Sequence, residues 1–273
     1  MFSLKSSRRT AARTVAVALA GAACAAMMTG SAEAIVNGRD STQRYPFMVS
    51  IPVTGVGDPT FKGVCGGALI DSQWVLTAAH CVDPGLVTLD GTVRIGSEWK
   101  SSGGTICSVA KTVSHPGYRN GEGTSFNRND VALIRLNRPV AEKPIRIADK
   151  PGRPGTPTRL LGFGRTDDTP DTPWVFPDRL QELDTRRGAV SECAPGYADS
   201  TLLCTISQVP KAMACNGDSG SPQLQRDPKG RWELTGVTSG PGAPGVRCSE
   251  GPGLYTSAPA YAGWIHEVIG RNG

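Results

Sequence analysis

A large excess of charge of either sign is missing from most of the sequence. The 273-residue chain has a formal net charge of +5, but residues 1–34 hold four basic side chains and one acidic one, which leaves 25 basic and 23 acidic residues beyond them. That balance argues against nucleic acid or an anionic membrane as the partner. The 8 cysteines include no Cys-x-x-Cys pair, and no loop is rich in acidic residues. We therefore expect neither a metal ion nor another cofactor.

Long hydrophobic runs are also missing, apart from one near the start of the chain. This run, Val15 to Met28, follows basic residues and precedes small residues that end in Ala32-Glu33-Ala34. It is short and rich in Ala and Gly, which is typical of a secretory signal peptide and not of a membrane span. We predict a signal peptide over residues 1–34, and hence a secreted, extracellular protein with no membrane attachment after signal removal. Arg8-Arg9 and Cys24 leave the export route open, and the Ala, Gly and Arg content indicates a bacterial style of sequence.

Helical periodicity is scarce, whereas Gly (34) and Pro (21) are plentiful. Short apolar stretches rich in Val, Ile, Leu and Thr recur between turn signals. They are Phe47–Val53, Gly67–Leu76, Thr92–Ile95, Val131–Leu136, Thr158–Phe163 and Trp232–Thr238. This pattern predicts many short antiparallel strands, and hence an all-β sandwich or barrel. One amphipathic helix is expected at the end of the chain, beginning at Pro259 and ending at Gly270.

A stretch dense in Pro, Gly and charge, from Ile145 to Pro157, divides the chain beyond residue 34 near its middle. We interpret it as the linker between two β-domains, which would occupy residues 35–150 and 151–273. A second polar stretch, Asp167 to Pro177, is interpreted as a long surface loop.

Histidine occurs only three times, which narrows the search for a catalytic base. His80 ends an apolar stretch and adjoins Cys81, a residue able to tether it. His115 lies beside a Pro-Gly turn and His266 lies on the expected helix, so both are interpreted as packing or surface residues. A catalytic His acts together with a hydroxyl nucleophile and with a carboxylate that orients its ring.

Candidates for these two groups stand in segments of distinctive sequence. Ser219 lies in Gly217-Asp218-Ser219-Gly220, a tight turn whose glycines permit positive φ and direct successive N–H groups at one spot. Asp130 opens a strongly apolar stretch that ends at Leu136. Taken alone, the turn fits an ordinary loop, and Asp130 fits a turn residue at the start of a strand. Their combination with His80 is what indicates nucleophilic hydrolysis.

Four blocks of sequence together resemble the trypsin–chymotrypsin family of serine proteases, and the resemblance covers nearly all of residues 35–273. The blocks are Ile35-Val36-Asn37-Gly38, Thr77-Ala78-Ala79-His80-Cys81, Asp130-Val131-Ala132-Leu133 and Gly217-Asp218-Ser219-Gly220. The order His, Asp, Ser is that of this family and not of subtilisins or α/β-hydrolases. The resemblance implies two six-stranded antiparallel β-barrels with a C-terminal α-helix, and a catalytic cleft between the barrels.

The resemblance also implies a role for each residue of the site. Ser219 would attack the scissile carbonyl, His80 would take its proton and pass it to the leaving amine, and Asp130 would orient the His80 ring. The backbone N–H groups of Gly217 and Ser219 would form the oxyanion hole.

The same resemblance implies activation by a new N-terminus. The amine of Ile35 would form an ion pair with Asp218 and so organise the oxyanion hole. Because Ala32-Glu33-Ala34 directly precedes Ile35, we expect signal peptidase itself to expose that amine. A mature chain that starts at Glu33 or earlier would instead indicate a short propeptide and a second cut.

Seven cysteines remain once Cys24 leaves with the signal, which in an oxidising compartment indicates three disulfides and one free thiol. Spacing alone does not assign the pairs. The resemblance implies Cys65–Cys81, Cys193–Cys204 and Cys215–Cys248. Cys107 is then the odd thiol, and we interpret it as a buried, small apolar group.

The expected substrate pocket departs from the trypsin pattern. Six residues before Ser219, where trypsins carry an Asp, the sequence has Met213, followed by Ala214. Without a carboxylate there is no partner for Arg or Lys, so an apolar side chain before the cleaved bond is favoured. The remaining residues that we expect at the pocket are Ser239, Gly240 and Gly253.

These observations predict a secreted serine endopeptidase that cleaves proteins or peptides through an acyl-enzyme and acts as a monomer. Protein inhibitors of proteases are expected as further partners. The alternative is a protease-like binding protein without activity, which would apply if the Gly240–Arg247 loop closes the pocket, yet no triad residue is missing. An esterase or lipase is not supported, because no Gly-x-Ser-x-Gly elbow surrounds a candidate serine.

Overall fold

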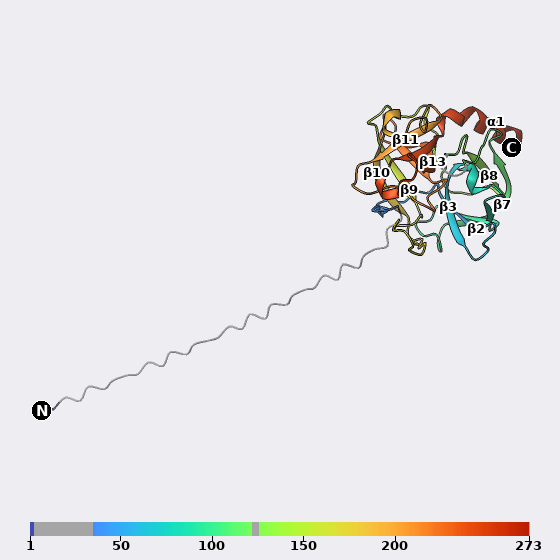
Figure 1. The fold of residues 1–273 in the computed structure, drawn as a ribbon. Coiled ribbons are helices and arrows are strands. Elements are labelled where there is room, and N and C mark those ends of the chain that lie inside the picture. Colours follow the sequence, from blue (N-terminus) through green and yellow to red (C-terminus); the bar gives the residue numbers. More distant parts are fainter. Residues whose placement is uncertain (3–34, 122–125, 273) are drawn as a thin grey trace. The chain divides into compact units, whose positions relative to one another are not determined.

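The computed structural model describes residues 1–2, 35–121 and 126–272, so the predicted signal peptide over residues 1–34 lies outside the described residues apart from Met1 and Phe2. Two antiparallel sheets and a C-terminal helix make up the described fold (Figure 1). The first sheet contains β2 (Met48–Gly55), β3 (Lys62–Asp71), β4 (Trp74–Thr77), β5 (Val87–Leu89), β6 (Thr92–Ile95), β7 (Thr105–Ser114) and β8 (Ala132–Leu136). The second contains β1 (Arg39–Asp40), β9 (Pro157–Gly162), β10 (Gln181–Arg187), β11 (Leu202–Ser207), β12 (Pro222–Arg226), β13 (Trp232–Pro241) and β14 (Gly253–Ser257).

Each sheet closes on itself. In the first sheet the hydrogen-bonded order β3–β4–β8–β7–β6–β2 returns to β3, and β5 pairs with β2 outside this ring. In the second sheet the order β10–β11–β14–β13–β12–β9 returns to β10, and β1 is added at β10. Closure pairs the strand edges that an open sheet would leave free. The predicted pair of six-stranded antiparallel barrels is therefore confirmed.

Burial alternates along some of the strands, most clearly in β6 and at the start of β9. In β6, Val93 and Ile95 are buried whereas Thr92 is exposed. In β9, Leu160 is buried and Arg159 beside it is only partly buried. Side chains two residues apart lie on the same face of a strand, so these strands direct one row of apolar side chains into the barrel, whereas β4 and β14 are buried on both faces.

The largest hydrophobic cluster extends through both barrels, and two smaller clusters are separate from it. A single cluster of buried side chains includes Leu76 and Leu133 from the first barrel together with Leu224 and Leu234 from the second. Because protein interiors are close-packed, this shared core fixes the two barrels against each other. Residues contributed by different barrels can therefore keep a constant geometry.

The beginning of the described chain pairs with the second barrel. Arg39 of β1 lies opposite Glu182 of β10 and forms salt bridges with both Glu182 and Asp184. The predicted domain limits, 35–150 and 151–273, stay a prediction, and the pairing of β1 shows that the chain crosses between barrels before the first barrel begins.

The C-terminal helix forms as its periodicity predicts. The short 3-10 helix η4 (Pro259–Tyr261) leads into α1 (Ala262–Asn272), and Ile265 and Val268 are buried on one face. The helix continues past the expected end at Gly270, because a single glycine in a helix interior costs only about 1 kcal/mol. None of the described helices is long and apolar enough to cross a membrane. The other short 3-10 helices are η1 (Ala79–Cys81), η2 (Val190–Glu192) and η3 (Cys248–Glu250).

Candidate active site

Three disulfides hold the segments that carry the candidate residues. They are Cys65–Cys81, Cys193–Cys204 and Cys215–Cys248, the pairs that the resemblance implies. Cys107 is a free, buried thiol, and burial raises its pKa. It therefore stays protonated and inert, as a small apolar group would.

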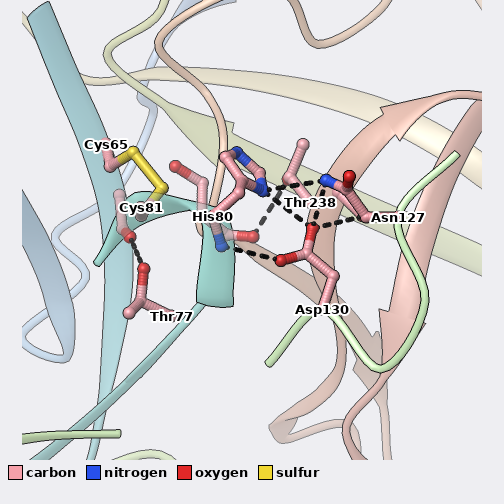
Figure 2. The surroundings of a disulfide bond; sticks show 10 residues. Cys65, Thr77, His80, Cys81, Asn127, Asp130 and Thr238 are labelled. Carbon is pink, nitrogen blue, oxygen red and sulfur yellow. Dashed lines mark hydrogen bonds and ion pairs between the residues drawn. A yellow bond between two sulfur atoms is a disulfide. The ribbon is translucent and has the colours of Figure 1, made fainter. Parts of the chain in front are cut away.

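His80 lies in η1, directly after β4, where the chain is tied to β3 twice. The disulfide joins the neighbouring Cys81 to Cys65 of β3 (Figure 2). At the end of β4, Thr77 donates its hydroxyl to the carbonyl of Gly66 at 2.7 Å. These links keep the short helix, and with it the His80 side chain, against the first barrel.

Asp130 accepts hydrogen bonds at both carboxylate oxygens. Its Oδ2 lies 2.7 Å from His80 Nδ1, and its Oδ1 accepts the backbone N–H of His80 at 3.0 Å. Because an ionised carboxylate only accepts, Nδ1 must carry the ring proton, which leaves Nε2 free to act as a base. The hydroxyl of Ser239 donates to the same Oδ2 at 2.6 Å, and the Thr256 hydroxyl donates to the Asp130 carbonyl at 2.9 Å. Asp130 is fully buried.

His80 and Asp130 each stabilise the charged form of the other. Burial alone would raise the pKa of Asp130, but the charge and hydrogen bonds of His80 and the hydroxyl of Ser239 hold it below its usual value. Burial likewise lowers the pKa of His80, and attraction to Asp130 more than offsets this, so that the pKa is raised overall. Asp130 is thus an anion at neutral pH that stabilises a positive charge on the ring.

Sequence reasoning missed Asn127. Its Nδ2 lies 3.1 Å from Asp130 Oδ2 and 3.3 Å from His80 Nδ1 (Figure 2). The only signal in the sequence is an amide three residues before the acid. Such a signal is too common to single out one residue.

The turn that contains Ser219 packs against β3 and β4, the strands that precede His80. Gly217 and Gly220 have φ of +94° and +77°, a region that side chains disfavour. A Cβ at Gly220 would lie 2.2 Å from Thr77 Oγ1, so only glycine permits this approach. The carbonyl of Ser219 also accepts the N–H of Gly66 at 2.7 Å.

The backbone around Ser219 leaves two N–H groups available. Asp218 N–H donates to Cys215 and Gly220 N–H donates to Thr238. Among the described residues, the N–H groups of Gly217 and Ser219 have no acceptor, and the Ser219 hydroxyl forms no hydrogen bond with the His80 ring. Catalytic hydrogen bonds are often long without substrate, and free N–H groups beside a hydroxyl suit a developing oxyanion.

Asp218 is a buried carboxylate that forms no ion pair within the part of the chain that the structure describes. Its Oδ1 accepts the N–H of Gly164 at 2.8 Å and its Oδ2 accepts the N–H of Cys215 at 2.9 Å. Burial nevertheless raises its pKa to about 7. Ile35, its predicted partner, is fully buried beside Met213. In this chain the Ile35 nitrogen belongs to a peptide bond with residue 34, so it carries no charge for an ion pair.

A cavity of about 320 Å³ lies next to Ser219. The five residues that sequence reasoning assigned to the pocket all line it, together with Ser219: Met213, Ala214, Ser239, Gly240 and Gly253. A Cβ at Gly253 would lie 3.1 Å from Met213 Sδ, so glycine keeps this wall open. No carboxylate is among the residues that line the cavity.

Several lining residues were not among those assigned to the pocket, although Pro241, Val246 and Arg247 belong to the Gly240–Arg247 loop considered above. They include Asn216, Pro241, Val246, Arg247 and Tyr255. The Cys215–Cys248 disulfide brings residues 246–248 beside residues 213–216, and this pairing is the signal that would have found Val246 and Arg247. Arg247 is the one charged residue among the lining residues, and it forms an ion pair with Glu250.

The described residues contain one group of three potential metal ligands, namely Cys65, His80 and Cys81. Both sulfurs are consumed by the disulfide, so this group cannot offer thiolates to a metal. The expectation that the protein needs no metal or cofactor stays a prediction.

Comparison with known proteins gives one consistent picture. A family model described as "Trypsin" matches residues 35–265. The chain is 31% identical to Trypsin epsilon of Drosophila erecta over 266 residues, which is 93% of this chain and 94% of that protein. It is 31% identical over 216 residues to Kallikrein-7 of Homo sapiens, covering 76% and 78% of the two chains. These relatives are animal proteins, so they do not support the interpretation of the composition as bacterial.

A solved structure is similar as well. It is entitled "Neuropsin, a serine protease expressed in the limbic system of mouse brain", and it matches with a TM-score of 0.69 and 27% identity. The match covers 86% of this chain and all of that one.

Proposed function

The chain belongs to the trypsin family of serine proteases, and from that premise we propose that it is an active endopeptidase that cleaves peptide bonds through an acyl-enzyme on Ser219. The observation that carries the proposal is the 2.7 Å bond between His80 Nδ1 and Asp130 Oδ2. Ser239 links this pair to the cavity beside Ser219, because it donates to Asp130 and also lines the cavity.

The residues divide the reaction into proton transfer and charge stabilisation. His80 Nε2 takes the Ser219 proton as the hydroxyl attacks the carbonyl, and later gives it to the leaving amine. Asp130 orients the ring and stabilises its positive charge. The free N–H groups of Gly217 and Ser219 bind the oxyanion, and each such donor is typically worth about 3 kcal/mol in the transition state.

An apolar side chain before the cleaved bond suits the cavity best. Met213 and Gly253 form part of its wall, and without a carboxylate it offers no counter-charge for Arg or Lys. Gly240 and Arg247, the ends of the loop that we considered as a possible plug, line the cavity and leave it open. This favours turnover over the inactive, ligand-binding alternative.

Activation proceeds by creation of the Ile35 amine. A buried carboxylate without a cation is costly, and the raised pKa of Asp218 reflects that cost. An ammonium at Ile35 removes this cost and holds the Gly217–Ser219 segment in place. Cleavage after Ala34 by signal peptidase supplies this amine directly, and the product acts outside the cell as a monomer on proteins or peptides.

Active-site labelling tests the proposal. The secreted protein, confirmed by N-terminal sequencing to begin at Ile35, is treated with a fluorophosphonate beside Ser219→Ala and His80→Ala. We expect the wild type to be labelled, Ser219→Ala to be unlabelled, and His80→Ala to react far more slowly. An unlabelled wild type with the correct N-terminus would show that Ser219 is not activated. The hypothesis of a protease-like binding protein without activity would then be favoured.

A further inference from the structure

The carboxamide of Asn127 lies where the proposed base meets its carboxylate. Its Nδ2 is 3.1 Å from Asp130 Oδ2 and 3.3 Å from His80 Nδ1, and Figure 2 shows the three groups facing one another. The residue is partly buried. None of the roles assigned above requires it, so its position needs a separate explanation.

The hydrogen-bond partners determine which way the amide points. Asn127 Oδ1 accepts the backbone N–H of Gly121 at 2.9 Å, so Nδ2 is the atom that faces Asp130. The reversed amide would oppose Oδ1 to a carboxylate oxygen and Nδ2 to another N–H group, and each of those contacts is repulsive. Asn127 is therefore a donor to Asp130.

Asp130 Oδ2 is consequently shared by three donors. They are His80 Nδ1, the Ser239 hydroxyl and Asn127 Nδ2. Asp130 is fully buried, and in such a medium hydrogen bonds to an ion are strong. Each additional donor disperses part of the negative charge, which weakens the attraction of Oδ2 for a protonated ring.

The contact between Asn127 and the ring has the same effect. With the Nδ1 proton directed at Asp130, Nδ1 and Asn127 Nδ2 are both donors, so their 3.3 Å contact brings two positive hydrogen-bearing groups together. This opposition increases when His80 becomes a cation. A donor at this place therefore disfavours the imidazolium while it fixes the carboxylate.

We propose that Asn127 is a positioning residue of the catalytic pair, one that holds Asp130 Oδ2 in place and limits how tightly His80 binds a second proton. The inference rests on the proposed function, because the basicity of His80 matters for turnover only if Ser219 is the nucleophile. A general base must be neutral at the working pH, and Asn127 widens the pH range in which His80 meets that condition.

The titratable groups that face His80 come from several elements. Asp130 precedes β8, and Asp83 follows η1; both carboxylates raise the pKa of His80, although burial lowers it. Tyr118, in the turn after β7, faces the same two acids, and burial together with their charges raises its pKa, so it stays neutral. Both acidic neighbours thus favour the charged ring, and the Asn127 amide acts in the opposite direction.

The direct test follows the titration of His80 by NMR in the secreted protein carrying Ser219→Ala, which prevents self-digestion. The chain has only three histidines, and His80→Ala identifies the relevant signals. Asn127→Ala removes the amide, and Asn127→Leu removes it while nearly preserving the volume. We expect the His80 midpoint to move to higher pH in both variants, while the His115 midpoint does not move.

Kinetics on the variants with Ser219 intact provide a second readout. If His80 holds its proton more tightly, kcat/KM at pH 6 should fall by roughly three- to tenfold, with KM little changed and the rate above pH 8 within about twofold of wild type. A purely structural Asn127 would lower thermal stability and leave the pH profile in place.

The outcomes separate this inference from the proposed function. An unmoved His80 midpoint in both variants overturns the role of Asn127, whatever the labelling of Ser219 shows. A shifted midpoint in a protein whose Ser219 does not react with fluorophosphonate overturns the proposed function and leaves the Asn127 contact supported.

Discussion

At the scale of single residues, Met213 is the position at which the pocket departs from the trypsin pattern. Replacement by Asp would place a carboxylate beside the cavity, where a substrate Arg or Lys can neutralise it. For Met213→Asp we expect the ratio of kcat/KM for Arg over Phe peptides to rise about tenfold or more. Paired peptide substrates that differ only before the cleaved bond measure this ratio.

Met213→Leu is the matched control for that change, because it keeps the side chain apolar and similar in volume. It should retain the preference for apolar residues. If Met213→Asp also keeps that preference while remaining folded, Met213 does not contact the substrate side chain and the pocket assignment fails.

Cys107 allows a second prediction at this scale. Its side chain is buried, and burial raises the pKa of its thiol, so little reactive thiolate is exposed. We expect no reaction with a thiol reagent in the native protein at pH 8 and one equivalent after denaturation without reductant. Reaction of the native protein would show that the segment around Cys107 opens readily.

At the scale of elements, η1 depends on its tether to β3. The Cys65–Cys81 disulfide closes a separation of 16 residues, for which the expected stabilisation is about 3 kcal/mol. Cys65→Ala combined with Cys81→Ala should lower the free energy of unfolding by about this amount. It should also lower kcat more than it raises KM, because His80 loses part of its support.

The Cys193–Cys204 disulfide is the control for that prediction. It closes a similar separation of 11 residues but does not adjoin η1. Its removal should reduce stability in urea denaturation to a similar extent with a smaller loss of kcat. Equal losses of kcat in the two double variants would indicate a general loosening of the fold.

At the scale of the whole molecule, the charge state of Asp218 should make the pH dependence of stability differ between the processed and unprocessed forms. Without an Ile35 amine, burial raises the pKa of Asp218 to about 7, so the folded chain prefers the protonated acid. Stability is then fully present below the ordinary pKa of about 4 and is lost as pH rises through about 7. The loss should approach about 4 kcal/mol.

Unfolding measurements from pH 4 to 8 check this prediction in the Ser219→Ala background. A form that keeps at least one residue ahead of Ile35 should lose stability over this range, and Asp218→Asn should flatten that loss. The form that begins at Ile35 should show no such loss, because its ammonium pairs with the ionised carboxylate. If the free energy of unfolding depends on pH in the same way in both forms, the ion pair between the Ile35 amine and Asp218 is contradicted.

The sequence by itself determined much of this protein, because the relevant information is local. Short apolar stretches rich in Val, Ile, Leu and Thr, separated by turn residues, predicted the strands, and the blocks around His80, Asp130 and Ser219 indicated the site. The resemblance carried by those blocks supplied barrel closure and the cysteine pairs, which spacing alone did not.

Only the tertiary structure decided the contacts made between distant segments. The pairing of β1 with β10 and the place of Asn127 beside Asp130 both depend on how the chain closes in space. No local pattern encodes such contacts, because the same short sequence can stand beside many partners. The close approach of Gly220 to Thr77 is set in the same way, since both barrels must first be packed together.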